Sequence, residues 1–171
     1  MKNRRSLACF AISVLALMIC AGTSQAAQTK ISGTISKTLT LTQDSELVGD
    51  VTCKVVGGPC IAFGAGGIKL RLNSFTMTGT SPGCTPATSF DDGMDVIQTS
   101  DVTILGPGLI RNFGGFGIFL ASESDVQIRG ITVTDSCFSG IFLGAVTDSE
   151  IEGNTSVRNS IGSEGAPCGG T

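Results

Sequence analysis

A repeat of 23 to 24 residues constrains the fold of this chain more than any other feature. Segments 93–101, 117–125 and 140–148 each begin with Gly and end with Asp, and their starts lie 24 and then 23 residues apart. A unit this short cannot bury an apolar side of its own, so each copy must supply part of its neighbour's core. The sequence therefore predicts a stack of similar units.

Within each copy, apolar residues recur at every second position, which is the spacing of a β-strand. The outward positions of this first strand are Asp95, Phe119 and Phe142. A second strand follows the Asp, and together the two strands supply the predicted core, which is Met94, Val96, Val102, Ile104, Ile118, Leu120, Val126, Ile128, Ile141 and Leu143.

A third strand is expected to complete each unit. It runs through Ile110, Val133 and Val157, and two residues after each of these comes a side chain suited to a left-handed or Asx turn, namely Asn112, Asp135 or Asn159. Three short strands in each unit predict an all-β parallel β-helix of about four to five coils, with coils about 4.8 Å apart. Leucine-rich repeats have a similar period but need Leu columns with a fixed Asn, and the Ile and Val columns here favour the β-helix.

A degraded copy of the repeat precedes these units. Gly67 aligns with Asp101, and counting back eight residues places Cys60 and Ala62 in the inward columns. We therefore expect capping strands and a first irregular coil over residues 27–66, and β-helix repeats over residues 67–171.

The segment 67–79, Gly-Ile-Lys-Leu-Arg-Leu-Asn-Ser-Phe-Thr-Met-Thr-Gly, resembles the early coil of secreted right-handed parallel β-helix proteins. This pectate lyase and polygalacturonase-like superfamily often has Leu-x-Leu-Asn-Gly-x-Thr-Ile-Thr-Gly there, whereas this chain has Ser74 in place of the Gly and Arg71 in place of an Asp. The resemblance covers about residues 38–165 and implies a right-handed helix. It does not specify an activity, because the superfamily includes lyases, hydrolases, epimerases and adhesins.

The first 26 residues are typical of a secretory signal peptide. Basic residues precede the apolar run 7–19, and Ser24-Gln25-Ala26 provides small residues for cleavage. Arg4-Arg5 half matches a twin-arginine signal, and Cys20 follows an Ile that is too bulky for a lipoprotein motif. The apolar run is too short for a membrane span, so we expect a secreted, periplasmic or cell-surface protein.

The composition beyond residue 26 limits both ligands and chemistry. Eight basic and 14 acidic residues remain, giving a formal net charge of −6, and the chain has no His, Trp or Tyr. Nucleic acid is therefore not an expected partner, and His-dependent catalysis is excluded. Five cysteines remain, of which Cys53 and Cys60 flank a short turn and are the predicted disulfide. The pairing of Cys84, Cys137 and Cys168 is left open.

The superfamily resemblance suggests two kinds of site. Asp91-Asp92 resembles the carboxylate dipeptide of polygalacturonases but lacks the accompanying His. Pectate lyases bind Ca²⁺ through outward carboxylates and use an Arg as base, which implicates Asp91, Asp92 and Asp95 as calcium ligands and Arg71 and Arg129 as basic groups. These acidic residues can equally be solvated turn formers.

Two functions remain open at the level of sequence. One is a non-catalytic secreted or surface module whose stacked outer face contacts extracellular polysaccharide or other surface partners. The other is the first part of a polysaccharide lyase or related enzyme. The outward ladder of Phe119 and Phe142 is a candidate for binding sugar rings, and the alternative is a ladder that is covered by a neighbouring turn or only stabilises the stack. Because residues 163–171 lack apolar alternation and a capping helix, we also expect either further coils or self-association through the C-terminal coil.

Overall fold

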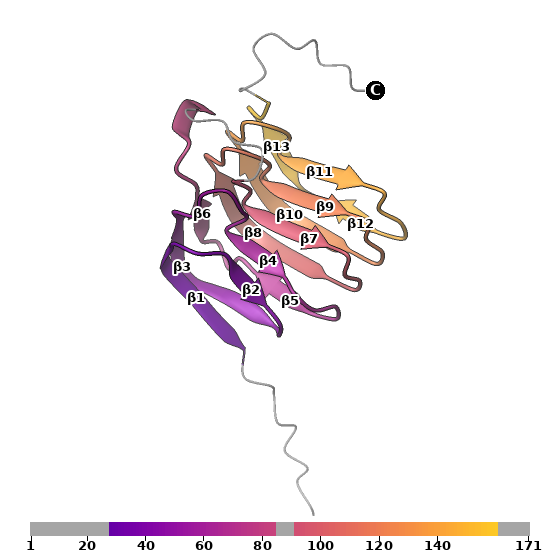
Figure 1. Ribbon diagram of the computed structural model, residues 1–171. Helices are drawn as coiled ribbons and strands as arrows, with labels where there is room; N and C mark the ends of the chain where they lie inside the picture. The colour runs from indigo at the N-terminus through magenta and orange to yellow at the C-terminus, as the bar shows by residue number, and fades with distance from the viewer. Residues whose placement is uncertain (1–27, 85–90, 161–171) are drawn as a thin grey trace, which may run out of the picture.

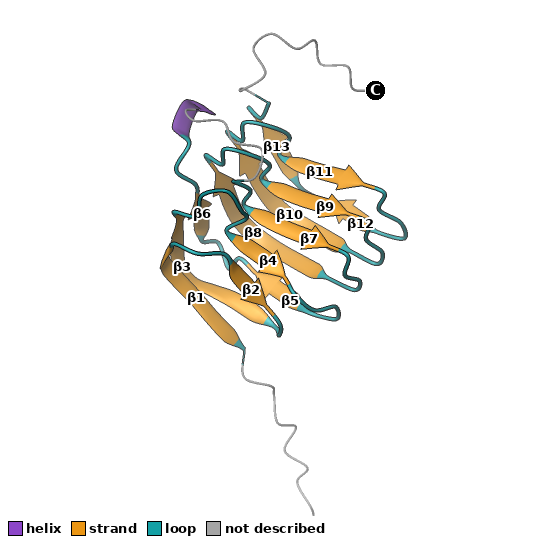
Figure 2. Ribbon diagram, in the orientation of Figure 1, coloured by secondary structure: helices purple, strands orange, loops and turns teal. Residues whose placement is uncertain are grey.

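The computed structural model describes residues 28–84 and 91–160, and this part of the chain is all-β (Figures 1 and 2). It contains two sheets, which we call sheet A and sheet B. The strands of sheet A are β1 (Thr29–Ile35), β3 (Ser45–Cys53), β5 (Lys69–Arg71), β6 (Thr76–Thr78), β8 (Thr103–Arg111), β10 (Gln127–Thr134), β12 (Glu150–Glu152) and β13 (Thr155–Val157). The strands of sheet B are β2 (Leu39–Leu41), β4 (Ile61–Phe63), β7 (Met94–Ile97), β9 (Ile118–Ala121) and β11 (Ile141–Gly144).

The chain alternates between the two sheets. After β1 it passes through sheet B and then sheet A five times within the described residues, and we call each pass a coil. Every strand pairs in parallel with strands of adjacent coils, as in β7, β9 and β11. Figure 1 shows sheet B in front of sheet A, so the two sheets enclose the core between them.

The predicted inward columns form the centre of this core. Met94 pairs with Ile118, and Ile118 with Ile141, so successive repeats are in register. The predicted core residues of the two middle repeats are fully buried, namely Met94, Val96, Val102, Ile104, Ile118, Leu120, Val126 and Ile128. In this way each coil buries apolar side chains against the next, as the period required.

Two core predictions in the last described coil are wrong. Ile141 is only half-buried, and Leu143 is 48% exposed although it pairs with the fully buried Leu120. No described residue covers the far side of this coil, so the same column that is buried in the middle of the stack is open at its edge.

The second and third strands of the repeat are continuous in the middle coils. β8 and β10 each include residues of both the predicted second strand and the predicted third strand. The pairing of β10 with β8 shifts register between Arg129 and Ile131, where Gly130 adopts a left-handed φ of 69°. The expected three-strand unit is therefore built as two sheets, one of which bends at the glycine.

Register in the third strand differs from the prediction by one residue. Val133 pairs with Ser156 and not with Val157, which is 42% exposed. The left-handed column is Asn112, Asp135 and Arg158, with φ of 60°, 57° and 52°. Asn159 therefore lies one residue beyond the left-handed column in which the sequence placed it, and its side-chain oxygen accepts a hydrogen bond from the Ser136 backbone N–H.

The first copy of the repeat also differs by one residue. Ile61 pairs with Met94, so the inward positions are Ile61 and Phe63, while Ala62 faces outward. Cys60 is buried, but in the position that corresponds to Gly93. The segment from Ile61 to Gly67 is one residue shorter than the equivalent segment from Met94 to Asp101. A fixed distance of eight residues therefore predicted the wrong inward positions for this copy.

The glycine that begins each repeat is required by the close approach of successive coils. A Cβ atom at Gly117 would lie 2.2 Å from Cγ1 of Val133 and 2.6 Å from the carbonyl oxygen of Gly140. Any larger side chain would push neighbouring coils apart, which explains why Gly recurs in this column.

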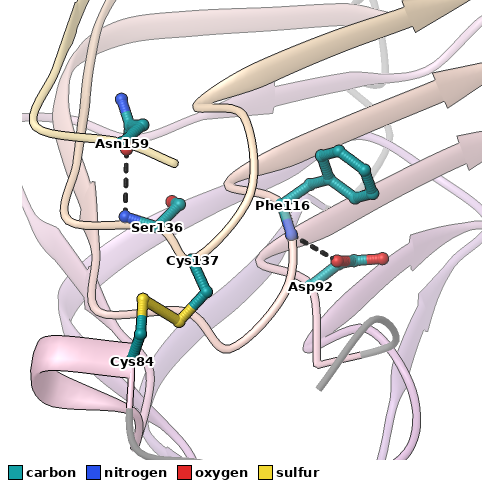
Figure 3. Close-up of a disulfide and its surroundings, with 6 residues drawn as sticks. All are labelled: Cys84, Asp92, Phe116, Ser136, Cys137 and Asn159. Atoms are coloured by element: carbon teal, nitrogen blue, oxygen red, sulfur yellow. Dashed lines mark hydrogen bonds between the residues drawn. A yellow bond between two sulfur atoms is a disulfide. The ribbon is translucent and has the colours of Figure 1, made fainter. Parts of the chain in front are cut away.

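Two disulfides join segments of the described chain. The predicted Cys53–Cys60 bond is present, with an S–S distance of 2.03 Å. A second bond links Cys84, in the short 3₁₀ turn η1 (Pro82–Cys84), to Cys137 (Figure 3). This bond fastens the long connection between β6 and β7, residues 79–93, to the stack, and we call this connection the insertion. Cys168, the predicted signal peptide and the whole of segment 163–171 lie outside the described residues. Within the described ranges, no helix has the length and apolar character needed to cross a membrane.

Candidate functional site

Four phenylalanine rings gather on the outer side of sheet B, and we call them the phenylalanine platform: Phe116, Phe119, Phe138 and Phe142. Phe119 on β9 and Phe142 on β11 are register partners, and their rings stack with centroids 5.2 Å apart and an interplanar angle of 4°. Parallel pairing places these outward side chains one above the other on adjacent coils. The structure thus brings together the two rings that the sequence placed in one ladder.

Phe116 and Phe138 extend the platform from the turns that precede β9 and β11. The Phe116 ring is 5.2 Å from Phe119, 5.1 Å from Phe142 and 5.4 Å from Phe138, tilted in each case. Phe138 and Phe142 are each 37% exposed, whereas Phe116 and Phe119 are half-buried. The platform therefore offers an apolar surface that is already ordered by ring contacts.

Sequence analysis did not identify Phe116 or Phe138 as site residues. Both lie in turns, outside the alternating strand pattern on which the inward and outward assignment depended. One feature of the sequence could have identified Phe116, which is its position directly before the repeated Gly117. Because this glycine allows the turn to approach the next coil closely, a ring beside it lies near the side chains of that coil.

A pair of carboxyl groups adjoins the platform. Asp95 on β7 is the register partner of Phe119, so its side chain lies one coil away in the same outward column. Asp92 precedes β7, is 6% exposed, and accepts a hydrogen bond from the Phe116 backbone N–H at 2.5 Å (Figure 3). The two carboxyls lie close enough for each to influence the pKa of the other.

The surroundings of this pair favour protonation. Burial is the main cause that raises the pKa of Asp92 to about 6 and that of Asp95 to about 7, from an ordinary value of 3.8. The proximity of the Asp92 carboxylate adds to the increase at Asp95, because two negative charges so close together are unfavourable. Near neutral pH the pair therefore holds a proton that ordinary aspartates would have released.

Of the three predicted calcium ligands, Asp92 and Asp95 lie together, whereas the Asp91 side chain is engaged elsewhere. Asp91 accepts a hydrogen bond from the Gly57 backbone N–H at 2.5 Å. This bond joins the end of the insertion to the turn that the Cys53–Cys60 disulfide closes. Among the described residues, no group of three or more His, Cys, Asp or Glu side chains is arranged to hold a metal ion. Asp92 and Asp95 therefore act as a carboxyl pair, with Asp91 engaged elsewhere.

The two predicted basic groups belong to sheet A and lie apart from the platform. Arg71 and Arg129 share an outward column with Leu105 between them, as the sequence suggested. Arg129 forms ion pairs with Glu150 and, at 3.5 Å, with Glu152, and the bond to Glu150 raises the pKa of its guanidinium. A guanidinium held in this way is poorly suited to act as a base.

A polar groove of about 820 Å³ lies at the carboxyl ends of β4, β7 and β9. Its lining includes hydroxyl side chains of the turns and Glu123, which is only 3% exposed. Glu123 Oε2 accepts a hydrogen bond from the Thr99 backbone N–H at 2.8 Å, while Oε1 is buried without a partner. The sequence did not single out Glu123, because the equivalent residue of the next coil is the apolar Val146.

The raised pKa values of Asp92 and Asp95 predict that stability falls as pH rises from about 4 to about 7. The unfolded chain releases both protons near pH 4, whereas the folded state holds them until about pH 6 to 7, so the free energy of unfolding decreases across that interval. After allowance for partial exposure we expect a loss of about 1 to 2 kcal/mol. In Asp95→Asn the dependence should be much weaker, which urea unfolding between pH 4 and pH 8 would measure.

The matched control is Asp101→Asn, which replaces an exposed aspartate at a left-handed turn position that Asn tolerates. This variant should retain the wild-type pH dependence. Equal slopes in wild type and Asp95→Asn would show that the carboxyl pair does not hold the proton.

Comparison with known proteins finds no matching family profile and no significantly similar curated protein or solved structure.

Proposed function

We propose that this chain is an exported right-handed parallel β-helix protein that binds polysaccharide on the outer face of sheet B. Two parallel sheets visited alternately by one chain support the β-helix, and two disulfides support an oxidising compartment. The right-handed sense is the one expected when a strand crosses over to a parallel strand. A β-helix supplies a long, regular outer surface, which suits an extended polymer.

The observation that carries this proposal is the stacked pair of Phe119 and Phe142. Their rings lie parallel, one coil apart, on an open sheet face and are backed by Phe116. A contiguous exposed apolar patch on a protein surface can mark a binding site. The apolar face of a sugar ring can pack on such rings, while the Asp95 carboxyl, one coil away, can bond sugar hydroxyls.

Phe119→Ala/Phe142→Ala is expected to weaken polysaccharide binding by at least about tenfold, because it removes the stacked surface. Affinity electrophoresis against a panel of neutral, amino and acidic polysaccharides would measure this loss. Phe142→Ala alone tests the same surface with less disturbance, since this ring lies at the edge of the described stack.

Val48→Ala is the matched control for the double variant. Val48 is a 43% exposed apolar residue on β3 of sheet A, away from the platform, and its loss should leave binding unchanged. Equal binding by wild type and the double variant, with both proteins folded by circular dichroism, would rule out the platform as the binding surface.

A further inference from the structure

The basic residues of this protein are absent from the strands of sheet B, whereas sheet A carries both basic and acidic side chains. All eight Lys and Arg residues that follow residue 26 lie in the described chain, and none is on a strand of sheet B. Five are on sheet A strands and three in the connections beside them: Lys30, Lys69, Arg71, Arg111 and Arg129, and Lys37, Lys54 and Arg158.

The charged groups beside the phenylalanine platform are acidic. Asp92 and Asp95 form the carboxyl pair next to Phe116 and Phe119, and Oδ1 of Asp95 is buried without a hydrogen-bond partner. At the carboxyl ends of the same strands, Glu123 lines the polar groove and also has an oxygen without a partner. No Lys or Arg lines that groove within the described chain.

This distribution separates the classes of polysaccharide that fit the surface. A polymer of uronic acids would bring carboxylates against Asp92 and Asp95 with no basic group to neutralise them, and like charges at an interface are unfavourable. A protonated amine would instead complement the carboxyl pair. Aromatic faces add to this preference, because their quadrupole attracts cations placed over the ring.

We propose that the ligand of the phenylalanine platform is a glycan with free amino groups, whose ammonium is held by the Asp92 and Asp95 carboxyls while its sugar rings pack on Phe119 and Phe142. This inference rests on the proposed function, since it specifies the sugar that the same surface binds. Asp95 provides the direct contact, and Asp92, which is anchored by the Phe116 N–H, positions it.

Three oligosaccharides of equal length test this preference by titration calorimetry with the mature chain. Oligoglucosamine, its N-acetylated form and oligogalacturonate differ in charge while keeping a pyranose backbone. We expect oligoglucosamine to bind at least about tenfold more tightly than the N-acetylated form, and oligogalacturonate most weakly. Equal affinity for the amino and acetylated forms, or tightest binding of oligogalacturonate, would overturn the inference.

Variants separate specific recognition from general attraction to an acidic protein. Asp95→Asn should lose the preference for free amines, whereas Glu46→Gln, at a half-buried position on β3 of sheet A, should keep it. Phe119→Ala/Phe142→Ala should lose binding of both oligoglucosamine and its N-acetylated form. Retained preference in Asp95→Asn would contradict the role of the carboxyl pair, whereas failure of wild type to bind any of the three would overturn the proposed function itself.

Discussion

Leu120→Ala is expected to lower the free energy of unfolding by about 2 to 5 kcal/mol. Leu120 is fully buried on β9, between β7 and β11 of the adjacent coils. Truncation leaves a cavity that these paired strands cannot fill without losing register, so both the transfer of the side chain and the cavity contribute. Chemical denaturation of the mature chain would measure the difference.

Leu143→Ala is the matched control, because Leu143 occupies the same column one coil later. It is 48% exposed, so its truncation should cost less than about 1 kcal/mol. A cost at Leu143 as large as at Leu120 would mean that further chain covers the last described coil. A small cost at both positions would mean that the inward and outward faces of β9 are assigned wrongly.

Removal of the Cys84–Cys137 disulfide is expected to destabilise the protein by about 4 kcal/mol, compared with about 2 kcal/mol for the Cys53–Cys60 disulfide. The first bond closes a loop with a sequence separation of 53 residues and the second one of 7. A longer loop restricts the unfolded chain more strongly, so its loss costs more. Thermal unfolding of the two double Cys→Ser variants would compare them.

The Cys84–Cys137 variant also tests how the insertion supports the site. The insertion contains Cys84 and carries Asp92 near its far end (Figure 3). Cys137 directly precedes Phe138, which belongs to the platform. The variant should therefore bind polysaccharide more weakly as well as unfold more easily. A smaller loss of stability than in the Cys53–Cys60 variant would contradict the loop-length account.

Much of the fold could be predicted from the sequence, because stacking forces equivalent residues into columns. The alternation around Val96 and Leu120 identified one face of sheet B, and the fixed distance from Gly to Asp set the register between coils. These two patterns predict the fold reliably because each residue must fit both its own strand and the equivalent strand of the next coil.

The errors arose where the period changes by one residue. The shorter turn after Phe63 shifted the first copy, and the third strand of the last coil was read one residue late, at Val157. A one-residue slip exchanges the two faces of a strand. The error at Leu143 has another cause. Its pairing with Leu120 was predicted correctly, but its burial depends on a covering coil, and no described residue supplies one.

The site was only partly predictable for a physical reason. Phe119 and Asp95 occupy regular strand positions, so their shared column follows from the repeat. Phe116 and Asp92 lie in turns, where the strand alternation of inward and outward residues does not apply. The hydrogen bond between them depends on the backbone geometry of these turns, which the alternation does not predict. The ion pairs of Arg129 were likewise hidden, since its partners lie on β12 of the next coil.

Nuclear magnetic resonance of the mature chain titrated with oligoglucosamine tests the central claim most directly. The account predicts shifts of the Phe119 and Phe142 ring signals and of backbone amides on β7, β9 and β11, with the amides of sheet A unchanged. Shifts confined to sheet A around Arg71, or no shift of the platform rings at saturating oligosaccharide, would contradict it.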